Sequence, residues 1–404
     1  MSQTEVQLIK NGAVVDADIN GMSSSKLSGA LPAISGASLT NLPTPIGKTR
    51  NLIINGAAQV AQRGTSAVAL TGYQSVDRYQ LDFGGGTDEN PSQEQGTVAA
   101  GTTPYTEGFR KTVKITNGNQ TTSPASNTDL YFQILYKLEG QDIANSGWNY
   151  LSSSSNITLS FWVKSSVAQE FYFRLQTSDG NSYNYPMSTG SLSADTWTKV
   201  TKTIPGNSNL TFDNDNGQSL NIEWVIYRGT GKTGSAATLN TWKVYDSSQR
   251  VPDVATSFYT TNNATFEITG VQLEVGSVAT DFEHRSFGQE LALCERYCQV
   301  IAEGANRYFA TSFAYNTSLA IGCFTFKTKM RSQPSMVQTT GTNYYFLAQA
   351  GTIHHFTQFE ALSHVGKDQS GIYPEQSAIS VTAGQAGGIS TVNASAKLLL
   401  TAEL

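Results

Sequence analysis

Two short segments of the chain combine aromatic rings with amide, hydroxyl and imidazole side chains. Sugars present CH faces that stack on aromatic rings, and hydroxyl groups that need polar hydrogen-bond partners. We therefore predict that these segments bind a glycan, and we favour the C-terminal one because loops on a rigid β frame carry recognition. For any single ring, the alternative is a place in a core or at a subunit interface. The glycan-binding candidates are Asn343, Tyr344, Tyr345, His354, His355, Phe356 and Gln358 in the C-terminal segment, and Tyr183 and Tyr185 in the other.

Motifs for catalysis are lacking in the sequence, and we expect no enzyme activity. The run Gly229-Thr-Gly-Lys232-Thr233 looks like part of a phosphate-binding loop, but that loop requires a glycine where Ile226 stands. No GxSxG, HExxH or zinc-ligand spacing is found. Two carboxylates that cleave a glycosidic bond need only lie about 5–10 Å apart in the fold, so the sequence leaves glycan cleavage open.

The sequence predicts no cofactor and no set of metal ligands. The acidic run Asp213-Asn-Asp215-Asn-Gly217 departs from the spacing of a calcium-binding EF-hand loop, because Gly217 takes a ligand position. We interpret this run as an exposed turn. The alternative is a structural calcium ion held by Glu274 and backbone carbonyls, by analogy with carbohydrate-binding modules.

The composition of the 404-residue chain narrows the classes of protein. Only 14% of the residues are charged and the net charge is −5, which argues against a surface that coats nucleic acid. No apolar run approaches the ~20 residues that span a bilayer, and the first residues lack the features of a signal peptide. We expect no membrane insertion. The 36 Gly, 18 Tyr and 18 Phe residues are typical of an all-β extracellular or virion surface protein.

Strand patterns dominate residues 49–285, for which we predict a jelly-roll-like β-sandwich. Within residues 171–175 apolar and polar side chains alternate, which is the period of a strand with one buried face. Within residues 266–275 the inward parity changes at Gly270, which predicts a β-bulge. Strands at this spacing, with loops rich in Asn, Gly and Ser, indicate an all-β sandwich.

One helix is predicted over residues 286–302, and it connects the sandwich to a C-terminal β knob of residues 303–404. Ser286 and Gln289 have the spacing of a capping box at the start of a helix. Four apolar side chains follow at helical spacing and form one stripe. This stripe consists of Leu291, Cys294, Cys298 and Ile301.

Residues 1–48 contain single apolar residues among Gly, Ser and Pro, too few to close a core. Two Leu-Pro pairs recur eleven residues apart. Such residues are buried when several identical chains run along one axis, much as repeat proteins bury a face on their neighbours. We predict an extended attachment and shaft segment in a homotrimer; a disordered linker is the alternative. The trimer-interface candidates are Leu27, Leu31, Ile34, Leu39 and Leu42, with Leu291, Cys294, Cys298 and Ile301 of the linker helix.

The runs at residues 51–64 and 266–297 resemble the jelly-roll domain of tailed-phage tail fibre proteins. One of them reads Phe266-Glu-Ile-Thr-Gly-Val-Gln-Leu-Glu. The similarity is to tail fibres of phages that infect cyanobacteria and other aquatic bacteria. It covers most of the chain, is patchy between residues 80 and 260, and is strongest over residues 266–297. The resemblance implies a homotrimeric virion component that binds a host-surface glycan.

We therefore predict a non-enzymatic tail fibre that recognises a host-surface glycan as a trimer. Its expected partners are a phage tail or baseplate protein, bound through residues 1–48, and a host cell-surface polysaccharide. Its expected place is the tail of the virion, after assembly in the host cytoplasm. The alternatives are a purely structural tail or collar component and a glycan-cleaving tailspike. Such tailspikes usually have a long parallel β-helix, whose short repeat is not found in this sequence.

Overall fold

The structure is a computed structural model that describes residues 50–404, and it confirms the predicted all-β fold. One group of β-sheets precedes the short helix α4 (Phe287–Cys294), and a second group follows it. In this described part of the chain, no helix is long and apolar enough to cross a membrane. The predicted attachment segment of residues 1–48 lies outside the described residues. So do its interface candidates Leu27, Leu31, Ile34, Leu39 and Leu42.

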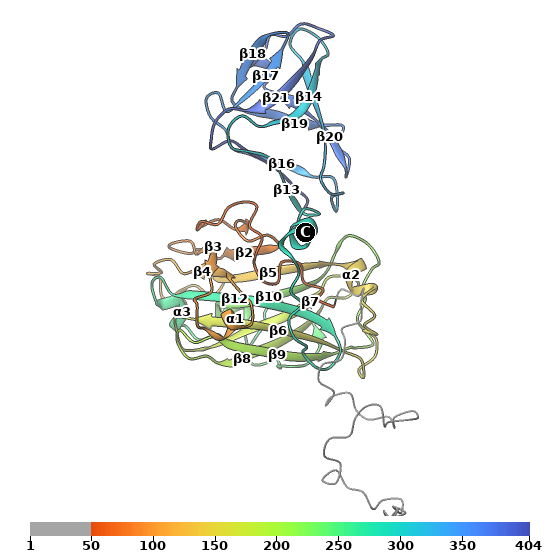
Figure 1. Cartoon of the computed structure of the whole chain (residues 1–404). Helices are drawn as coiled ribbons and strands as arrows, with labels where there is room; N and C mark the ends of the chain where they lie inside the picture. The colour runs from red at the N-terminus through yellow and green to blue at the C-terminus, as the bar shows by residue number, and fades with distance from the viewer. Residues whose placement is uncertain (1–49) are drawn as a thin grey trace, which may run out of the picture. The chain divides into compact units, whose positions relative to one another are not determined.

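The first group of strands forms a sandwich of two antiparallel sheets, which Figure 1 shows as stacked layers. Strands far apart in the sequence lie side by side in both sheets. The larger sheet has, in spatial order, β1 (Gly72–Tyr73), β2 (Tyr79–Gly84), β5 (Tyr131–Glu139), β10 (Gln218–Arg228), β7 (Glu170–Thr177), β8 (Tyr183–Ser191) and β11 (Lys243–Val244). The smaller sheet has β3 (Ser92–Thr97), β4 (Lys111–Thr116), β12 (Thr265–Val275), β6 (Asn156–Ser165) and β9 (Thr198–Pro205).

Short helices occupy the connections of the sandwich, and none of them contributes a layer. Most residues of these connections lie at or near the surface, as expected for segments between strands. The helices are α1 (Thr103–Thr106), α2 (Gly140–Ala144) and α3 (Ser257–Thr260), with single 3₁₀ turns η4 (Pro124–Ser126) and η5 (Thr230–Lys232).

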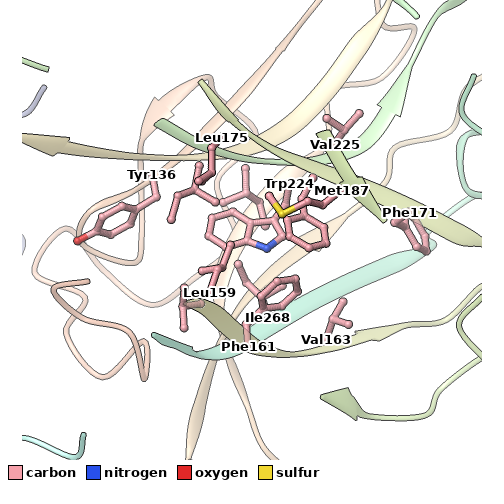
Figure 2. Packing of buried hydrophobic residues seen from close by; sticks show 14 of the residues in the cluster. Tyr136, Leu159, Phe161, Val163, Phe171, Leu175, Met187, Trp224, Val225 and Ile268 are labelled. Atoms are coloured by element: carbon pink, nitrogen blue, oxygen red, sulfur yellow. The ribbon is translucent and has the colours of Figure 1, made fainter. Parts of the chain in front are cut away.

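Aromatic rings fill the space between the two sheets of the sandwich. Trp224 of β10 is 1% exposed, and its ring packs edge-on against Phe161 of β6, with the ring centroids 5.7 Å apart. Phe161 makes a second edge-on contact with Phe173 of β7, at 5.0 Å. Figure 2 shows the Trp224 indole among aliphatic and aromatic side chains of both layers. Burying a large apolar side chain contributes roughly 1.5–3 kcal/mol, so this cluster holds the sheets together.

The predicted β-bulge at Gly270 of β12 is confirmed. The register of β12 against β6 shifts between Thr269 and Gln272. Gly270 has φ = +62°, and a Cβ atom at this position would lie 2.6 Å from the Phe109 ring. Only glycine combines this left-handed backbone with so close a neighbour.

The second group of strands forms the C-terminal β knob, again with antiparallel sheets. Its core is a separate cluster that includes Leu347, Ile372 and Ile389. The larger sheet has, in spatial order, β18 (Thr352–Phe356), β17 (Tyr345–Gln349), β21 (Ala386–Thr391), β14 (Tyr308–Ala314), β15 (Ala320–Thr325), β20 (Gln369–Pro374) and β19 (Phe359–Ser363). The smaller sheet has β13 (Cys298–Glu303), β22 (Lys397–Thr401) and β16 (Ser335–Gln338), and a 3₁₀ turn η6 (Gln376–Ala378) follows β20.

The predicted linker helix over residues 286–302 is too long. Helix α4 spans Phe287–Cys294 and begins at the expected capping box, in which Gln289 N donates to Ser286 Oγ. The chain then forms strand β13 instead of further helical turns. Strand β13 pairs with β22, about a hundred residues later, and this long-range partner is not visible in the local apolar spacing.

Two trimer-interface candidates of that helix are buried inside the chain. Cys294 and Cys298 are both 0% exposed, and burial raises the pKa of each thiol. Side chains without exposed surface cannot contact a sister chain, so the structure corrects this prediction. Leu291 and Ile301 are half-buried, and Ile301 packs against the knob core.

Charged side chains of the sandwich bind the last residues of the knob. Arg78 is 1% exposed, and its Nη1 donates to Glu403 Oε2 at 2.6 Å. Its guanidinium also lies 3.5 Å from the centre of the Tyr297 ring. Arg63 reaches the second oxygen of Glu403 at 3.1 Å. A buried ion-pair network therefore connects the end of the described chain to the sandwich.

Candidate functional site

Two candidate rings of the knob, Tyr345 and Phe356, lie in its hydrophobic core. Their side chains are 0% and 2% exposed, and their ring centroids are 5.8 Å apart. The Tyr345 hydroxyl donates to Thr339 O at 2.8 Å. A ring with no exposed face cannot stack on a sugar, so the structure removes both residues from the glycan-binding set. The reason is the pairing of β17 with β18, in which these two residues are partners facing the core.

The other candidates of the knob do not converge on one place. Asn343 is exposed in a turn, with φ = +56°, and Tyr344 beside it is half-buried. His354 and His355 are consecutive residues of β18 and so point to opposite faces of the sheet. Gln358 is exposed in the turn that follows β18. These residues stay a prediction, without a shared surface to support it.

The two tyrosines of the sandwich segment also face inward. Tyr185 is 3% exposed and packs against Trp242, with the ring centroids 5.0 Å apart, so it is not available to a ligand. Tyr183 has the same parity and packs half-buried against the sandwich core. Asn184 lies between them and points to the other side of β8. That other side is the outer face of the larger sheet.

Polar side chains predominate on the outer face of the larger sandwich sheet, with Leu135 and Val225 among them, and we call this surface the polar face. Its members lie at the strand positions that alternate with the aromatic core residues. Cross-strand pairing puts Arg174 opposite Glu223, and Gln176 opposite Asn221. The polar face consists of Gln80, Asp82, Tyr131, Gln133, Tyr172, Arg174, Gln176, Asn184, Asn221, Glu223 and Arg228.

A buried ion pair lies at the centre of the polar face. Arg174 Nε donates to Glu223 Oε2 at 2.7 Å, and its Nη2 contacts the other oxygen of the same carboxylate. Arg174 Nη1 also donates to Asn184 Oδ1 at 3.0 Å. Burial by itself would raise the pKa of Glu223, but the adjacent Arg174 and Arg228 outweigh burial and lower this pKa. Glu223 is therefore a carboxylate held in its charged form.

Four polar atoms of this face are buried without a hydrogen-bond partner among residues 50–404: Gln80 Oε1, Asn221 Oδ1, and Nε and Nη1 of Arg228. Arg228 is 1% exposed and donates through Nη2 to Gln133 Oε1. Burial, partly offset by Glu223, lowers the pKa of Arg228 to about 10, so it stays charged at neutral pH. A buried polar group without a partner costs roughly 1–3 kcal/mol, which a polar ligand would recover.

Half-exposed tyrosines border these buried groups. The guanidinium carbon of Arg228 lies 5.5 Å from the centre of the Tyr131 ring. The Tyr245 ring lies between two arginines, 5.4 Å from Arg174 and 5.5 Å from Arg250. Both rings are half-exposed. The polar face therefore combines hydrogen-bonding groups with aromatic surface, which is what a sugar requires.

The carboxylate proposed for calcium binding is engaged in hydrogen bonds. Glu274 accepts from Thr280 N at 2.9 Å, from Thr280 Oγ1 at 2.6 Å and from Gln272 Nε2 at 2.8 Å. In the described part of the chain, no three His, Cys, Asp or Glu side chains gather as a metal-ligand set. The geometry around Glu274 is that of a loop held by its own side chains.

Comparisons with known proteins give partial matches among solved structures. No protein-family model matches the chain, and no curated protein matches it. The enzymatically active domain of tailspike protein 4 of bacteriophage CBA120 is 9% identical with a TM-score of 0.30; the match covers 56% of this chain and 21% of that one. The chain thus spans about a fifth of that tailspike domain.

Carbohydrate-binding modules are also among the similar structures. The family 11 module of a Clostridium thermocellum cellulosomal cellulase is 15% identical with a TM-score of 0.25, over 55% of this chain and 99% of the module. A family 30 module is 11% identical with a TM-score of 0.25, over 57% and 95%. Identities and scores this low transfer no ligand and no activity to this chain. The resemblance to tail fibres stays a prediction.

The sequence contained a signal for the polar face that its interpretation did not use. Arg174 and Gln176 alternate with the core residues of β7, and Glu223 alternates with those of β10. A charged residue in the middle of a strand is ordinarily a solvated one. Only the pairing of β7 with β10, two segments about 50 residues apart, turns Arg174 and Glu223 into a buried pair.

Proposed function

We propose that this protein is a non-enzymatic component of a phage tail that binds a host-surface glycan through the polar face. The observation that carries the proposal is the set of buried hydrogen-bonding groups on an outer sheet surface. Four of their atoms have no partner among residues 50–404. A surface that only meets water leaves such atoms solvated, whereas a binding surface holds them in place before the ligand arrives. The tail role and the homotrimer are supported by the sequence resemblance.

Binding is favoured over cleavage by the state of Glu223. A nucleophile or general base needs a free carboxylate oxygen that can reach the substrate. Both oxygens of Glu223 are engaged by Arg174, and Arg228 lies 3.4 Å from one of them. The other carboxylate of the face, Asp82, accepts from Gln133 Nε2 at 2.8 Å. Glu223 therefore acts as an ion-pair partner within the protein, whereas Asp82 is engaged through one of its two oxygens.

Weak binding at one site would suffice for attachment of a virion. Three copies in a trimer, and several fibres on one particle, raise the avidity through effective concentration. Weak binding at each site is expected of a hydrogen-bonding surface with few aromatic rings, because each contact contributes about 0.5–1.5 kcal/mol.

A glycan array probed with the full chain tests the proposal, followed by titration of a retained glycan. Removing the half-exposed side chains in Tyr172→Ala and Gln176→Ala should weaken binding about five- to tenfold each, because each deletes one contact at the border of the face. The matched controls are His355→Ala and Gln358→Ala on the knob, which should leave the affinity unchanged.

Three outcomes would contradict the proposal. Loss of binding in the knob variants alone would assign the site to the knob. A folded chain that retains no glycan would favour a structural tail component. Release of reducing ends from a bound polysaccharide, abolished by Asp82→Asn, would favour a cleaving enzyme.

A further inference from the structure

Guanidinium groups outnumber their counter-ions at the centre of the polar face. Arg174, Arg228 and Arg250 all lie close enough to Glu223 to lower its pKa against the effect of burial. Asp82 is the second carboxylate, and burial raises its pKa, which makes it the weaker counter-ion. Three positive groups therefore share one fully charged carboxylate and a second, partly buried one.

The positive charge that lacks a matching carboxylate lies mainly on Arg228. Its Nη2 is engaged by Gln133 and lies 3.4 Å from Glu223, whereas its Nε and Nη1 have no partner among residues 50–404. A buried charge that lacks part of its hydrogen bonds destabilises the folded state unless a ligand supplies them. The nearby Arg174 and Arg250 add repulsion, which the same ligand would relieve if it carried negative charge.

Two half-exposed side chains, Tyr131 and Arg250, lie near this guanidinium. Tyr131 lies beside Arg228 and rests on Gly84, where a Cβ atom would come within 3.1 Å of its hydroxyl oxygen. The Tyr131 ring thus occupies the space that a side chain at Gly84 would take, and a ligand that contacts Arg228 has to displace this ring. Arg250 is half-exposed, and its Nε donates to Ser247 O at 3.2 Å. Arg250 thus offers an accessible cation next to the covered one.

We infer that the polar face selects an anionic glycan, whose sugar oxyanions are bound by the guanidinium groups of Arg228 and Arg250. The inference rests on the proposed function and names the substrate class of the same site. Guanidinium groups are well matched to carboxylate and sulfate oxygens, because their donors are planar and always charged. The chain as a whole has a net charge of −5, so a polyanion is favoured at this face and repelled elsewhere.

The experiment titrates the full chain with polygalacturonate, with the same polymer after chemical reduction of its carboxyl groups, with dextran sulfate and with poly-L-glutamate. Polygalacturonate or dextran sulfate should bind at least about tenfold more tightly than the reduced polymer. Preference for one of the two tells carboxylate from sulfate recognition. Poly-L-glutamate, an anion without sugar, should bind no better than the reduced polymer.

Variants of the arginines connect this preference to the site. Arg250→Gln should reduce the preference for the anionic polymer about fivefold, and Arg250→Lys should restore part of it. Arg228→Lys keeps the charge but loses the guanidinium geometry, and it should reduce the preference further. Arg110→Gln removes an exposed arginine that packs on Tyr105 and precedes β4 of the smaller sheet, not the sheet that carries the polar face, and it should change nothing. Because Arg250 is half-exposed, its variants are expected to fold.

The outcomes separate this inference from the function on which it rests. Equal or tighter binding of the reduced, neutral polymer would overturn anion selection while leaving glycan binding in place. Poly-L-glutamate binding as tightly as the anionic polysaccharides would show simple charge attraction and overturn the inference as well. No binding of any polysaccharide, here or on the array, would overturn both.

Discussion

The sandwich and the knob each contain a seven-stranded antiparallel sheet, but they differ in what they bury. Among residues 303–404 the buried polar side chains are all uncharged hydroxyl and amide groups. The sandwich buries Asp77, Arg78, Arg174, Glu223 and Arg228. Burying charges is unfavourable unless they are paired or serve a ligand. The two sheets share one architecture, and the buried charges distinguish the sandwich, where we propose the binding surface.

The outer surface of the seven-stranded knob sheet exposes apolar side chains, unlike the polar face of the sandwich. Phe313 is 44% exposed and Ile353 is 56% exposed, and both lie on strands of this sheet. An open hollow of about 500 Å³ lies elsewhere on the knob, beside Pro334 and Val365. Single exposed apolar residues are normal on protein surfaces. Among the described residues of the knob sheet, Ser312 Oγ is a buried side-chain atom without a hydrogen-bond partner, but no buried charged group accompanies it as on the polar face.

The contrast between the buried charges of the sandwich and the uncharged core of the knob predicts that substitution of Glu223 causes the largest loss of stability. Glu223→Ala leaves Arg174 and Arg228 buried without their counter-ion and should lower the free energy of unfolding by about 3–5 kcal/mol. The matched variant Glu360→Ala removes an exposed knob carboxylate, bonded to Gln376, and should cost less than about 1 kcal/mol. Chemical denaturation of both variants measures the difference. Equal effects would mean that the charges of the polar face are solvated like those of the knob.

Asp77 of the sandwich should contribute to the pH dependence of stability, beside Asp142, whose pKa burial also raises to about 6. Burial, partly offset by Arg63, raises the pKa of Asp77 from 3.8 to about 6. An acid with a raised pKa stabilises the folded state fully below pH 3.8, and this contribution is lost as the pH rises through about 6. Its size is on the order of 3 kcal/mol.

The variant Asp77→Asn isolates this contribution. Unfolding free energies of the wild type and of the variant are measured between pH 4 and pH 7. The wild type should lose stability relative to Asp77→Asn as the pH rises over this interval. If the difference in unfolding free energy between the two proteins stays constant with pH, the pKa of Asp77 is not raised by burial and its carboxylate is in contact with water.

The smallest effect is expected on the outer surface of the knob. Ile353→Ser replaces an exposed side chain of β18 and should change the free energy of unfolding by less than about 0.5 kcal/mol. Glycan affinity measured by titration should stay within about twofold of the wild type. A clear loss of affinity would make the knob sheet a part of the binding surface and blur the contrast between the two regions.

Local patterns in the sequence were sufficient for several elements. The alternation over residues 171–175 predicted the inward side of β7, which now packs on the aromatic core. The parity change at Gly270 predicted a bulge, and Ser286 with Gln289 predicted the start of α4. Each of these signals is a short-range rule, in which neighbouring residues alone decide the backbone.

Other expectations failed where a distant strand decided the outcome. The C-terminal candidate segment was expected to lie on loops, yet it contains β17 and β18. Tyr345 and Phe356 look like ligand-binding rings among polar neighbours, but their strands pair and direct both into a core. Cys298 continues an apolar helical stripe in the sequence, but in the structure it lies in β13 and pairs with β22. In each case tertiary pairing outweighed the local preference.

By itself, the sequence determined that the chain is all-β, because alternation, turn residues and a low content of charge are properties of neighbouring positions. It also determined which residues of β7 and β10 point away from the core. Only the tertiary structure decided that Arg174, Glu223 and Arg228 meet on one surface, since pairing strands that are distant in the chain sets their register. Charge on a strand is a local fact, whereas a buried cluster of charges depends on which strands become neighbours.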